Sequence, residues 1–251
     1  MQSLPLPAAG DRWCLFLDFD GTLAEIAPAP HLVEIDPALP ELLMRLSGQL
    51  DGALAIITGR PLDDLDALLA PAALTAAGQH GLEKRDSAGR IHTPQTSMGV
   101  QSLVESEFNP LVAAEPRLVF ENKTHSFSLH YRQAPEQEQA CRAAVARLLP
   151  QLEGYHLLDG KKVLEIKPCF ANKGHAIADF LNDPVFSGRT PVFAGDDVTD
   201  EDGFAVINAQ GGISIKVGTG PSAATHRVQS EAALINWLHA VAEVLAGQAD
   251  K

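Results

Sequence analysis

The chain has 251 residues, of which 45% are hydrophobic and 20% charged, and this composition excludes a collagen-like, fibrous or disordered protein. Lys and Arg number 19 and Asp and Glu 32, giving a net charge of −13, so the overall field repels nucleic acid and anionic membranes. We expect neither as a partner, and an anionic substrate requires a local cluster of positive groups.

Cysteine usage and the N-terminus bear on the compartment. Three widely spaced cysteines fit no metal-binding pattern and favour a reducing environment over a disulfide framework. The first residues lack the basic and then apolar pattern of a signal peptide, and no apolar run approaches the ~20 residues needed to cross a bilayer. We therefore predict a cytoplasmic protein, and a monomer.

Three short runs of continuous apolar residues predict strands buried on both faces, at 13–19, 53–57 and 190–194. Between and after them, apolar residues at helical spacing predict helices that include 39–46 and 234–245. Strands that alternate with helices predict an α/β fold with a doubly wound, mostly parallel sheet. Ligands of such sheets bind beyond the carboxyl ends of the strands, where each of the three apolar runs meets polar residues.

The middle of the chain has a different pattern, which predicts a small α+β unit inserted into the α/β domain. A hairpin is expected within 78–93. The expected elements of the insertion are, in order, helix 98–112, strands 117–121 and 126–132, helix 136–149, and strands 155–158 and 162–166. We accordingly predict a core of residues 1–97 and 169–251 and an inserted unit of residues 98–168.

Acidic residues follow two of the predicted strands. Asp18 and Asp20 come directly after the first strand, and Gly21 allows the chain to turn there. Asp196, Asp197 and Asp200 follow the strand at 190–194. Each cluster alone could be a polar turn or a helix cap. If Asp18, Asp20 and Asp196 converge, however, their mutual repulsion requires a cation, and oxygen ligands favour Mg²⁺.

Thr58 and Lys173 complete this set. Thr58 ends the second strand and could donate a hydrogen bond to a phosphoryl oxygen, and Lys173 at a helix start could neutralise the same group. Each has an ordinary alternative, since Thr before Gly is a common turn residue and Lys at a helix start is commonly solvated.

Taken in order, these residues resemble the haloacid dehalogenase superfamily of aspartyl phosphohydrolases. The superfamily pattern is DxDx[TV], then Ser or Thr, then Lys, then an acidic motif, and it is matched by Asp18, Asp20 and Thr22, by Thr58, by Lys173, and by 195–200. The resemblance implies the corresponding α/β core, with 98–168 as an inserted cap that carries substrate specificity.

Further motifs are similar to the trehalose-6-phosphate phosphatase family within that superfamily. They are Ile57-Thr58-Gly59-Arg60, His80-Gly81-Leu82-Glu83, Glu121 with Lys123, His130-Tyr131-Arg132, and Lys161 with Glu165, Lys167 and Pro168. The resemblance implies Mg²⁺-dependent hydrolysis of trehalose 6-phosphate, the last step of trehalose biosynthesis. The residues that it implies for substrate binding are Gly59, Arg60, His80, Gly81, Glu121, Lys123, Arg132, Lys161, Glu165 and Asn172.

The resemblance also implies a mechanism. Asp18 would attack phosphorus and form an aspartyl-phosphate, while Asp20 would protonate the leaving oxygen and then activate water. Asp18, the main-chain carbonyl of Asp20 and Asp196 would hold Mg²⁺, and Thr58 and Lys173 would stabilise the transferring phosphoryl group. The supporting acids Asp197 and Asp200 would orient Lys173 and the metal-bound waters.

Several alternatives stay open. Another sugar phosphate, such as sucrose phosphate, could be the substrate of the same core. A phosphoacceptor signalling module combines similar residues but is about half this length, and a non-catalytic sugar-phosphate sensor would not need the intact acidic set. The charged residues of the insertion could be ordinary solvated strand positions, and His130 and Tyr131 could be packing residues.

Overall fold

The computed structural model describes residues 4–27, 32–93, 98–123, 126–169 and 172–249. The chain divides into two compact units, a core unit of residues 1–92 and 172–251 and a smaller unit of residues 93–171. The role of the smaller unit as a cap stays a prediction.

The core unit is built on an eight-stranded sheet with the order β12-β11-β10-β1-β2-β3-β4-β5. Neighbouring strands are parallel from β12 to β3, and β4 and β5 are antiparallel. The strands are β1 (Trp13–Leu17), β2 (Leu54–Ile57), β3 (Thr75–Gly78), β4 (Glu83–Arg85), β5 (Ile91–His92), β10 (Thr190–Gly195), β11 (Ile213–Val217) and β12 (His226–Val228). This arrangement confirms the predicted α/β fold with a mostly parallel sheet.

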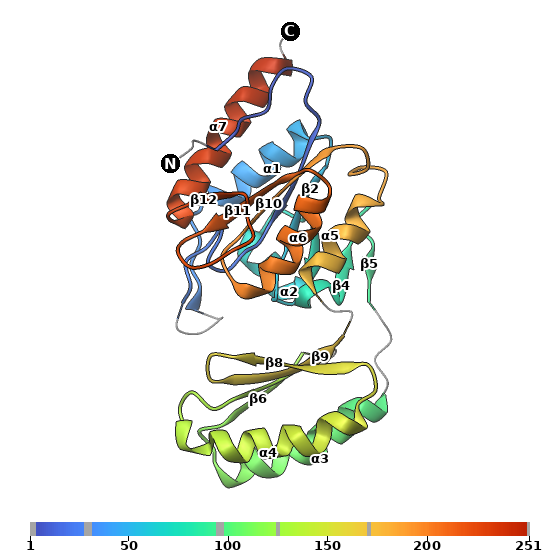
Figure 1. Ribbon diagram of the computed structural model, residues 1–251, viewed down its shortest axis with the longest axis vertical. Helices are drawn as coiled ribbons and strands as arrows, with labels where there is room; N and C mark the ends of the chain where they lie inside the picture. Colours follow the sequence, from blue (N-terminus) through green and yellow to red (C-terminus); the bar gives the residue numbers. More distant parts are fainter. Residues whose placement is uncertain (1–3, 28–31, 94–97, 124–125, 170–171, 250–251) are drawn as a thin grey trace. The chain divides into compact units, whose positions relative to one another are not determined.

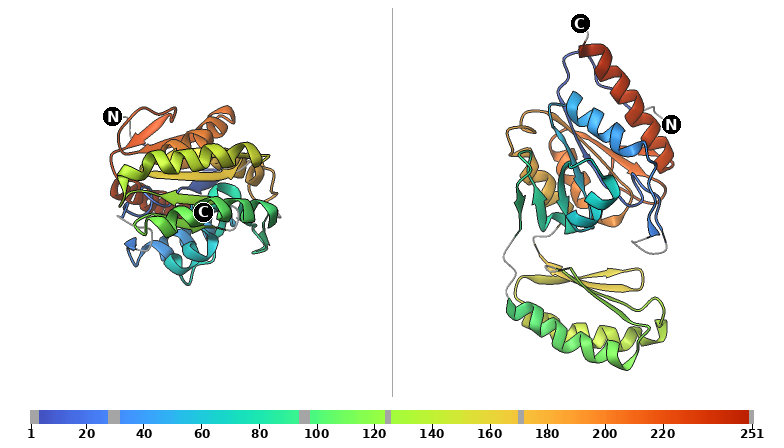
Figure 2. Two further views of the ribbon diagram at one scale, coloured as in Figure 1. Left: turned by 90° about the horizontal axis from the view of Figure 1, so that it is seen from below. Right: turned by 180° about the vertical axis from the view of Figure 1, so that it is seen from behind.

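Helices cover both faces of this sheet (Figures 1 and 2). Helices α1 (Leu39–Gln49) and α7 (Glu231–Ala249) pack against each other, as do α5 (Lys173–Leu181) and α6 (Glu201–Ala209), while α2 (Leu62–Leu69) packs on β3. Because both faces are covered, every residue of β1 and β2 is buried, which is the reason that these strands are continuous apolar runs.

The smaller unit is a four-stranded antiparallel sheet with the order β6-β7-β9-β8 and two helices on one face. Its elements are α3 (Met98–Ala114), β6 (Val119–Asn122), β7 (Phe127–His130), α4 (Glu138–Leu148), β8 (Tyr155–Gly160) and β9 (Val163–Pro168). A separate apolar core that includes Phe108, Phe127 and Leu129 holds sheet and helices together. The order of helix, two strands, helix and two strands is the one predicted from the sequence.

Strand register brings the predicted site residues together. Leu17 of β1 pairs with Ala194 of β10 and with Ile56 of β2, and the backbone N–H of Asp18 donates to the carbonyl of Ala194 at 3.0 Å. The residues that follow these three strands therefore lie side by side at the carboxyl-end edge of the sheet. The strand order changes direction between β1 and β10, which is the position where sheets of this kind bind ligands.

None of the helices within the described ranges combines the length and the hydrophobicity that a bilayer-spanning segment requires.

Candidate active site

A buried ion-pair network lies at the carboxyl end of β1. The ammonium group of Lys173 donates to Asp18 Oδ1 and to Asp200 Oδ1, each at 2.7 Å, and all three side chains are at most 4% exposed. Lys173 is brought here because it is the first residue of α5, whose preceding residue Asn172 caps the helix by accepting the N–H of His175 at 2.7 Å. Lys173 and Asp18 thus meet across 155 positions of sequence.

Burial sets the ionisation of this network. Desolvation raises the pKa of Asp18 to about 6 against the opposing effect of Lys173, and it raises the pKa of Asp200 to about 6 with the charge of Asp18 adding to it. Desolvation alone would lower the pKa of Lys173, but the carboxylates of Asp18 and Asp200 outweigh it, so the pKa lies above its usual value. Lys173 is therefore a cation at neutral pH.

Asp196 brings a third carboxylate to this group. Oxygens of Asp18, Asp196 and Asp200 lie within 4.8 Å of one another, and the hydroxyl of Thr22 lies 3.1 Å from Asp18 Oδ2 and 3.4 Å from Asp196 Oδ1. Burial also raises the pKa of Asp196. The Lys173 ammonium contacts two of these three carboxylates, so the carboxylates outnumber the cation that they face.

This cluster fits a hard divalent cation. All of its donors are oxygens, the chemistry that Mg²⁺ prefers. Gly21 keeps the approach to Asp196 open, because it has a φ of +83° and a Cβ at this position would lie 2.3 Å from Asp196 Oδ2. Asp200 is wholly buried and accepts three hydrogen bonds, so we assign it to holding the loop. Asp18 and Asp196 are then the better candidates to hold a metal.

The loop after β10 is built around Asp200. Its Oδ2 accepts hydrogen bonds from the backbone N–H groups of Asp196 and Asp197, both at 2.9 Å. Position 195 has room only for glycine, because a Cβ there would lie 2.3 Å from the Asp200 carboxyl carbon. Asp197 caps the short helix that follows by accepting the N–H of Val198 at 2.7 Å. Asp200 thus contacts Lys173 directly, whereas Asp197 acts on the backbone.

Thr58, at the end of β2, is buried and its Oγ1 accepts the backbone N–H of Arg60 at 3.1 Å. Its carbonyl accepts the N–H of His80 at 2.9 Å. His80 adopts a left-handed conformation with a φ of +58°, and its ring covers Gly59 so closely that a Cβ at position 59 would lie 2.9 Å from Nε2. The predicted residues Thr58 and Gly59, which follow β2, therefore pack against His80, which follows β3.

Gly81 follows with a φ of +101°, and a Cβ there would lie 3.1 Å from Ala176 Cβ on α5. This close approach brings the loop that carries His80 against the helix that begins at Lys173.

Arg60 has a partner that we did not predict. Its guanidinium is engaged with Asp20, with Nε 2.7 Å from Oδ2 and Nη2 2.6 Å from Oδ1, and its predicted role in binding substrate stays a prediction. The two ends of this ion pair come from the loops after β1 and β2, which are adjacent strands.

A comparison with known families identifies the family of this chain. The family model for trehalose-phosphatases matches residues 16–245, which is most of the chain. The chain belongs to the trehalose-phosphatase family. Trehalose-6-phosphate phosphatase of Escherichia coli is 40% identical over 239 residues, covering 95% of this chain and 90% of that protein.

Two solved structures support the fold of this trehalose-phosphatase family member. The C-terminal domain of the Candida albicans trehalose-6-phosphate phosphatase has a TM-score of 0.78 and 21% identity, covering 93% of this chain and 92% of that one. A haloacid dehalogenase-like hydrolase from Bacteroides thetaiotaomicron has a TM-score of 0.62 and 14% identity, covering 92% of this chain and 100% of that one. These likenesses confirm the predicted fold.

The sugar-binding residues predicted for the smaller unit lie on its sheet and turns. Glu121 pairs with Ser128, which pairs with Glu165, so the two glutamates share one face of the sheet. Glu121 Oε2 lies 3.2 Å from His130 Nε2 and 3.8 Å from Lys123 Nζ, and the hydrogen bond from His130 lowers the pKa of Glu121.

Arg132 and Lys161 are exposed and lie at one end of that sheet, because the N–H of Tyr131 donates to the carbonyl of Lys162 at 3.1 Å. Tyr131 itself is 3% exposed and belongs to the core of the smaller unit. Of the pair left open by the sequence, Tyr131 is therefore a packing residue and His130 contacts Glu121.

Two residues near the site received no role from the sequence. Glu83 links the packed loops, since its carboxylate accepts from Leu62 N–H and from Gln79 Nε2, both at 2.7 Å. Lys216 is 6% exposed, and its ammonium group donates to the carbonyl of Asp196. A charged residue within the apolar strand β11 was the available signal for Lys216.

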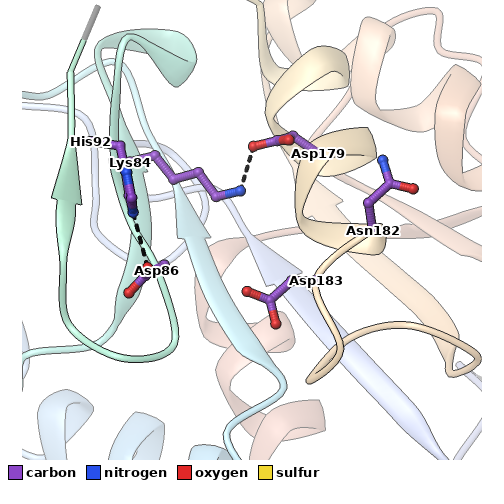
Figure 3. A pocket seen from close by; sticks show the side chains of 6 residues that line it. All are labelled: Lys84, Asp86, His92, Asp179, Asn182 and Asp183. Atoms are coloured by element: carbon purple, nitrogen blue, oxygen red, sulfur yellow. Dashed lines mark hydrogen bonds and ion pairs between the residues drawn. The ribbon is translucent and has the colours of Figure 1, made fainter.

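A polar pocket on the core unit lies between the β4–β5 hairpin and α5 (Figure 3). It is lined by Lys84, Asp86, His92, Asp179, Asn182 and Asp183, none of which is a predicted site residue. Lys84 pairs with Asp179 and His92 with Asp86, so the charged groups drawn in the pocket largely satisfy one another.

Proposed function

We propose that this chain hydrolyses trehalose 6-phosphate to trehalose and inorganic phosphate with Mg²⁺, through an aspartyl-phosphate on Asp18. The observation that carries the proposal is the Asp18 carboxylate, which is buried, hydrogen-bonded to Lys173 and Thr22, and next to Asp196. The name of the 40%-identical Escherichia coli relative supports the choice of substrate.

In the first step, an oxygen of Asp18 forms a bond to phosphorus and the bond from phosphorus to the sugar oxygen breaks. The Asp20 carboxyl gives its proton to that oxygen, which leaves as a hydroxyl of trehalose. In the second step, water attacks phosphorus, Asp20 takes the proton of the water, and Asp18 leaves as a carboxylate. Phosphate is released and both aspartates return to their starting forms.

Lys173 and Thr58 serve both steps. The positive charge of Lys173 offsets the negative charge on the phosphoryl oxygens, and the Thr58 hydroxyl donates to one of them. Asp18, the Asp20 carbonyl and Asp196 would hold Mg²⁺, which when bound supplies charge neutralisation and alignment of the phosphoryl group.

We propose further that the smaller unit is the cap that selects the sugar. Glu121, Lys123, Arg132, Lys161 and Glu165 would bind the disaccharide hydroxyls, since carboxylates and cations bind hydroxyls well. In the core unit, Gly59, His80, Gly81 and Asn172 would line the phosphate side.

Phosphate release from a panel of esters tests the proposal. The panel contains trehalose 6-phosphate, sucrose 6-phosphate and glucose 6-phosphate, each with Mg²⁺ and with a chelator. We expect Mg²⁺-dependent release that strongly favours trehalose 6-phosphate and is abolished in Asp18→Asn. Comparable turnover of all three esters would remove the trehalose assignment, and release from sucrose 6-phosphate alone would favour the related sucrose-phosphate activity.

A further inference from the structure

The contact between Arg60 and Asp20 is a two-point clamp. Nε and Nη2 of Arg60 face the two carboxylate oxygens of Asp20, at 2.7 and 2.6 Å. The Arg60 side chain is 9% exposed and that of Asp20 is 36% exposed, so the pair is open on the side of the aspartate. Two parallel N–H···O bonds fix direction as well as distance, which a single contact from an ammonium group does not.

Arg60 is itself held firmly. Its N–H donates to Thr58 Oγ1 at 3.1 Å, and its carbonyl accepts the N–H of Gln79 at 2.9 Å. The guanidinium lies 5.7 Å from the centre of the Phe19 ring, a cation–π distance. Backbone and side chain are thus both anchored to core-unit elements, so Arg60 provides a rigid reference for Asp20.

On the basis of the proposed function, we propose that Arg60 is a positioning residue that sets the direction of the Asp20 carboxyl for proton transfer at the leaving oxygen, and is not a substrate-binding residue. Proton transfer depends on alignment of donor and acceptor within hydrogen-bond reach. The Nε and Nη2 atoms of Arg60 are both engaged with Asp20, so this edge of the guanidinium acts on the carboxyl.

The leaving group separates these two roles. A sugar alkoxide leaves poorly without a proton, whereas nitrophenolate leaves without one. If Arg60 acts through Asp20, its loss slows the first step with a sugar phosphate and spares the first step with p-nitrophenyl phosphate. If Arg60 binds the phosphate, its loss weakens binding of both esters equally, because they share that group.

The experiment measures the first turnover of both esters with the Mg²⁺-loaded enzyme, by rapid quench for trehalose and by absorbance for nitrophenolate. The variants are Arg60→Gln, Asp20→Asn and the double variant, and Arg60→Lys keeps the test available if Arg60→Gln does not fold. For Arg60→Gln we expect a loss on the order of 10²-fold with trehalose 6-phosphate and less than about 5-fold with p-nitrophenyl phosphate, with KM little changed. The double variant should be no slower than Asp20→Asn, as expected for residues acting as one unit.

The core unit offers a matched control. Arg85 on β4 is also buried and also grips both carboxylate oxygens of an aspartate, Asp66 on α2, but it belongs to none of the site loops. Arg85→Gln should lower the melting temperature without changing the ratio of the two first-turnover rates.

Other outcomes overturn the proposal. An equal rise in KM for both esters would make Arg60 a phosphate ligand, and a rise in KM for trehalose 6-phosphate alone would make it a sugar ligand. Rates that fall together, as expected of a structural defect, would reduce Arg60 to a fold-stabilising residue. Failure of the proposed function gives a different signature, in which the wild-type enzyme releases nothing from trehalose 6-phosphate. Glucose 6-phosphate then replaces it as the sugar ester in the same comparison.

Discussion

Replacing Lys173 by Met tests whether the buried ion-pair network is as tightly balanced as its geometry indicates. The substitution keeps an unbranched side chain of nearly the same length and removes the ammonium group that contacts both Asp18 and Asp200, which are nearly inaccessible to solvent. Removal of one partner of a buried pair leaves uncompensated charge and costs about 3–5 kcal/mol of unfolding free energy. We expect a loss of this size at pH 7.5 in the presence of a chelator.

The loss should depend on pH in a definite direction. Asp18 and Asp200 have folded-state pKa values of about 6, above the unfolded values near 4, and removal of Lys173 raises them further. Carboxyls with raised pKa values destabilise the folded state when ionised, so stability returns as the pH falls through their folded pKa. At pH 5.5 we expect the cost of Lys173→Met to be smaller by at least about 1.4 kcal/mol, the equivalent of one pKa unit.

Urea unfolding followed by tryptophan fluorescence measures this cost. Both tryptophans, Trp13 and Trp237, belong to the core unit, and their rings lie 6.4 Å apart, so the signal reports the unit that contains Lys173. Lys84→Met is the control, because its pair with Asp179 is more exposed and such pairs contribute about 0–1 kcal/mol. A loss below about 1 kcal/mol for Lys173→Met at pH 7.5, or equal losses at both pH values, would refute the reasoning.

Two further predictions follow from the carboxylate cluster. The pKa values of Asp18 and Asp200 are raised to about 6, so the metal-free wild-type protein should melt at a higher temperature at pH 5.5 than at pH 7.5. Saturating Mg²⁺ should reduce this difference in melting temperature. If calorimetry gives the same pH dependence for Asp18→Asn as for the wild type, the prediction is contradicted. Gly21→Ala should greatly weaken Mg²⁺ binding, measured by titration calorimetry, because the new Cβ would lie 2.3 Å from Asp196 Oδ2. Gly89→Ala is the control, because Gly89 also has a positive φ, of +77°, but has open space around it. This variant should lose only about 1 kcal/mol of unfolding free energy to backbone strain and should keep its Mg²⁺ affinity. Equal Mg²⁺ affinity in the two variants would refute the steric argument.

The sequence predicted β1, β2 and β10 because burial on both faces leaves continuous apolar runs. It did not predict β11 (Ile213–Val217), which carries a lysine, or β3, whose sequence Thr-Ala-Ala-Gly has little intrinsic strand preference. This strand forms because β2 and β4 flank it with open hydrogen-bonding edges. The edge strand β12, with only three residues, was likewise too short to produce a periodic signal.

The site divides in the same way. The nearness of Asp18, Thr58, Lys173 and Asp196 was predictable because each follows a strand or begins a helix at the same edge of a parallel sheet. The partner of Arg60 was not, because it depends on the direction of a long side chain toward a loop 40 positions away. The different contacts of Asp197, which caps a helix, and Asp200, which contacts Lys173, also depend on local loop geometry. A run of nearby acidic residues in the sequence does not reveal that geometry.

The most direct test of the central claim is chemical trapping of the phosphorylated residue. The enzyme is mixed with trehalose 6-phosphate and Mg²⁺, quenched during the first turnover, treated with borohydride and digested for mass spectrometry. Borohydride reduces an aspartyl-phosphate to homoserine, so we predict homoserine at position 18 in an amount that follows the burst of trehalose. A burst of trehalose with Asp18 unmodified, or with the modification at another aspartate, would contradict the account.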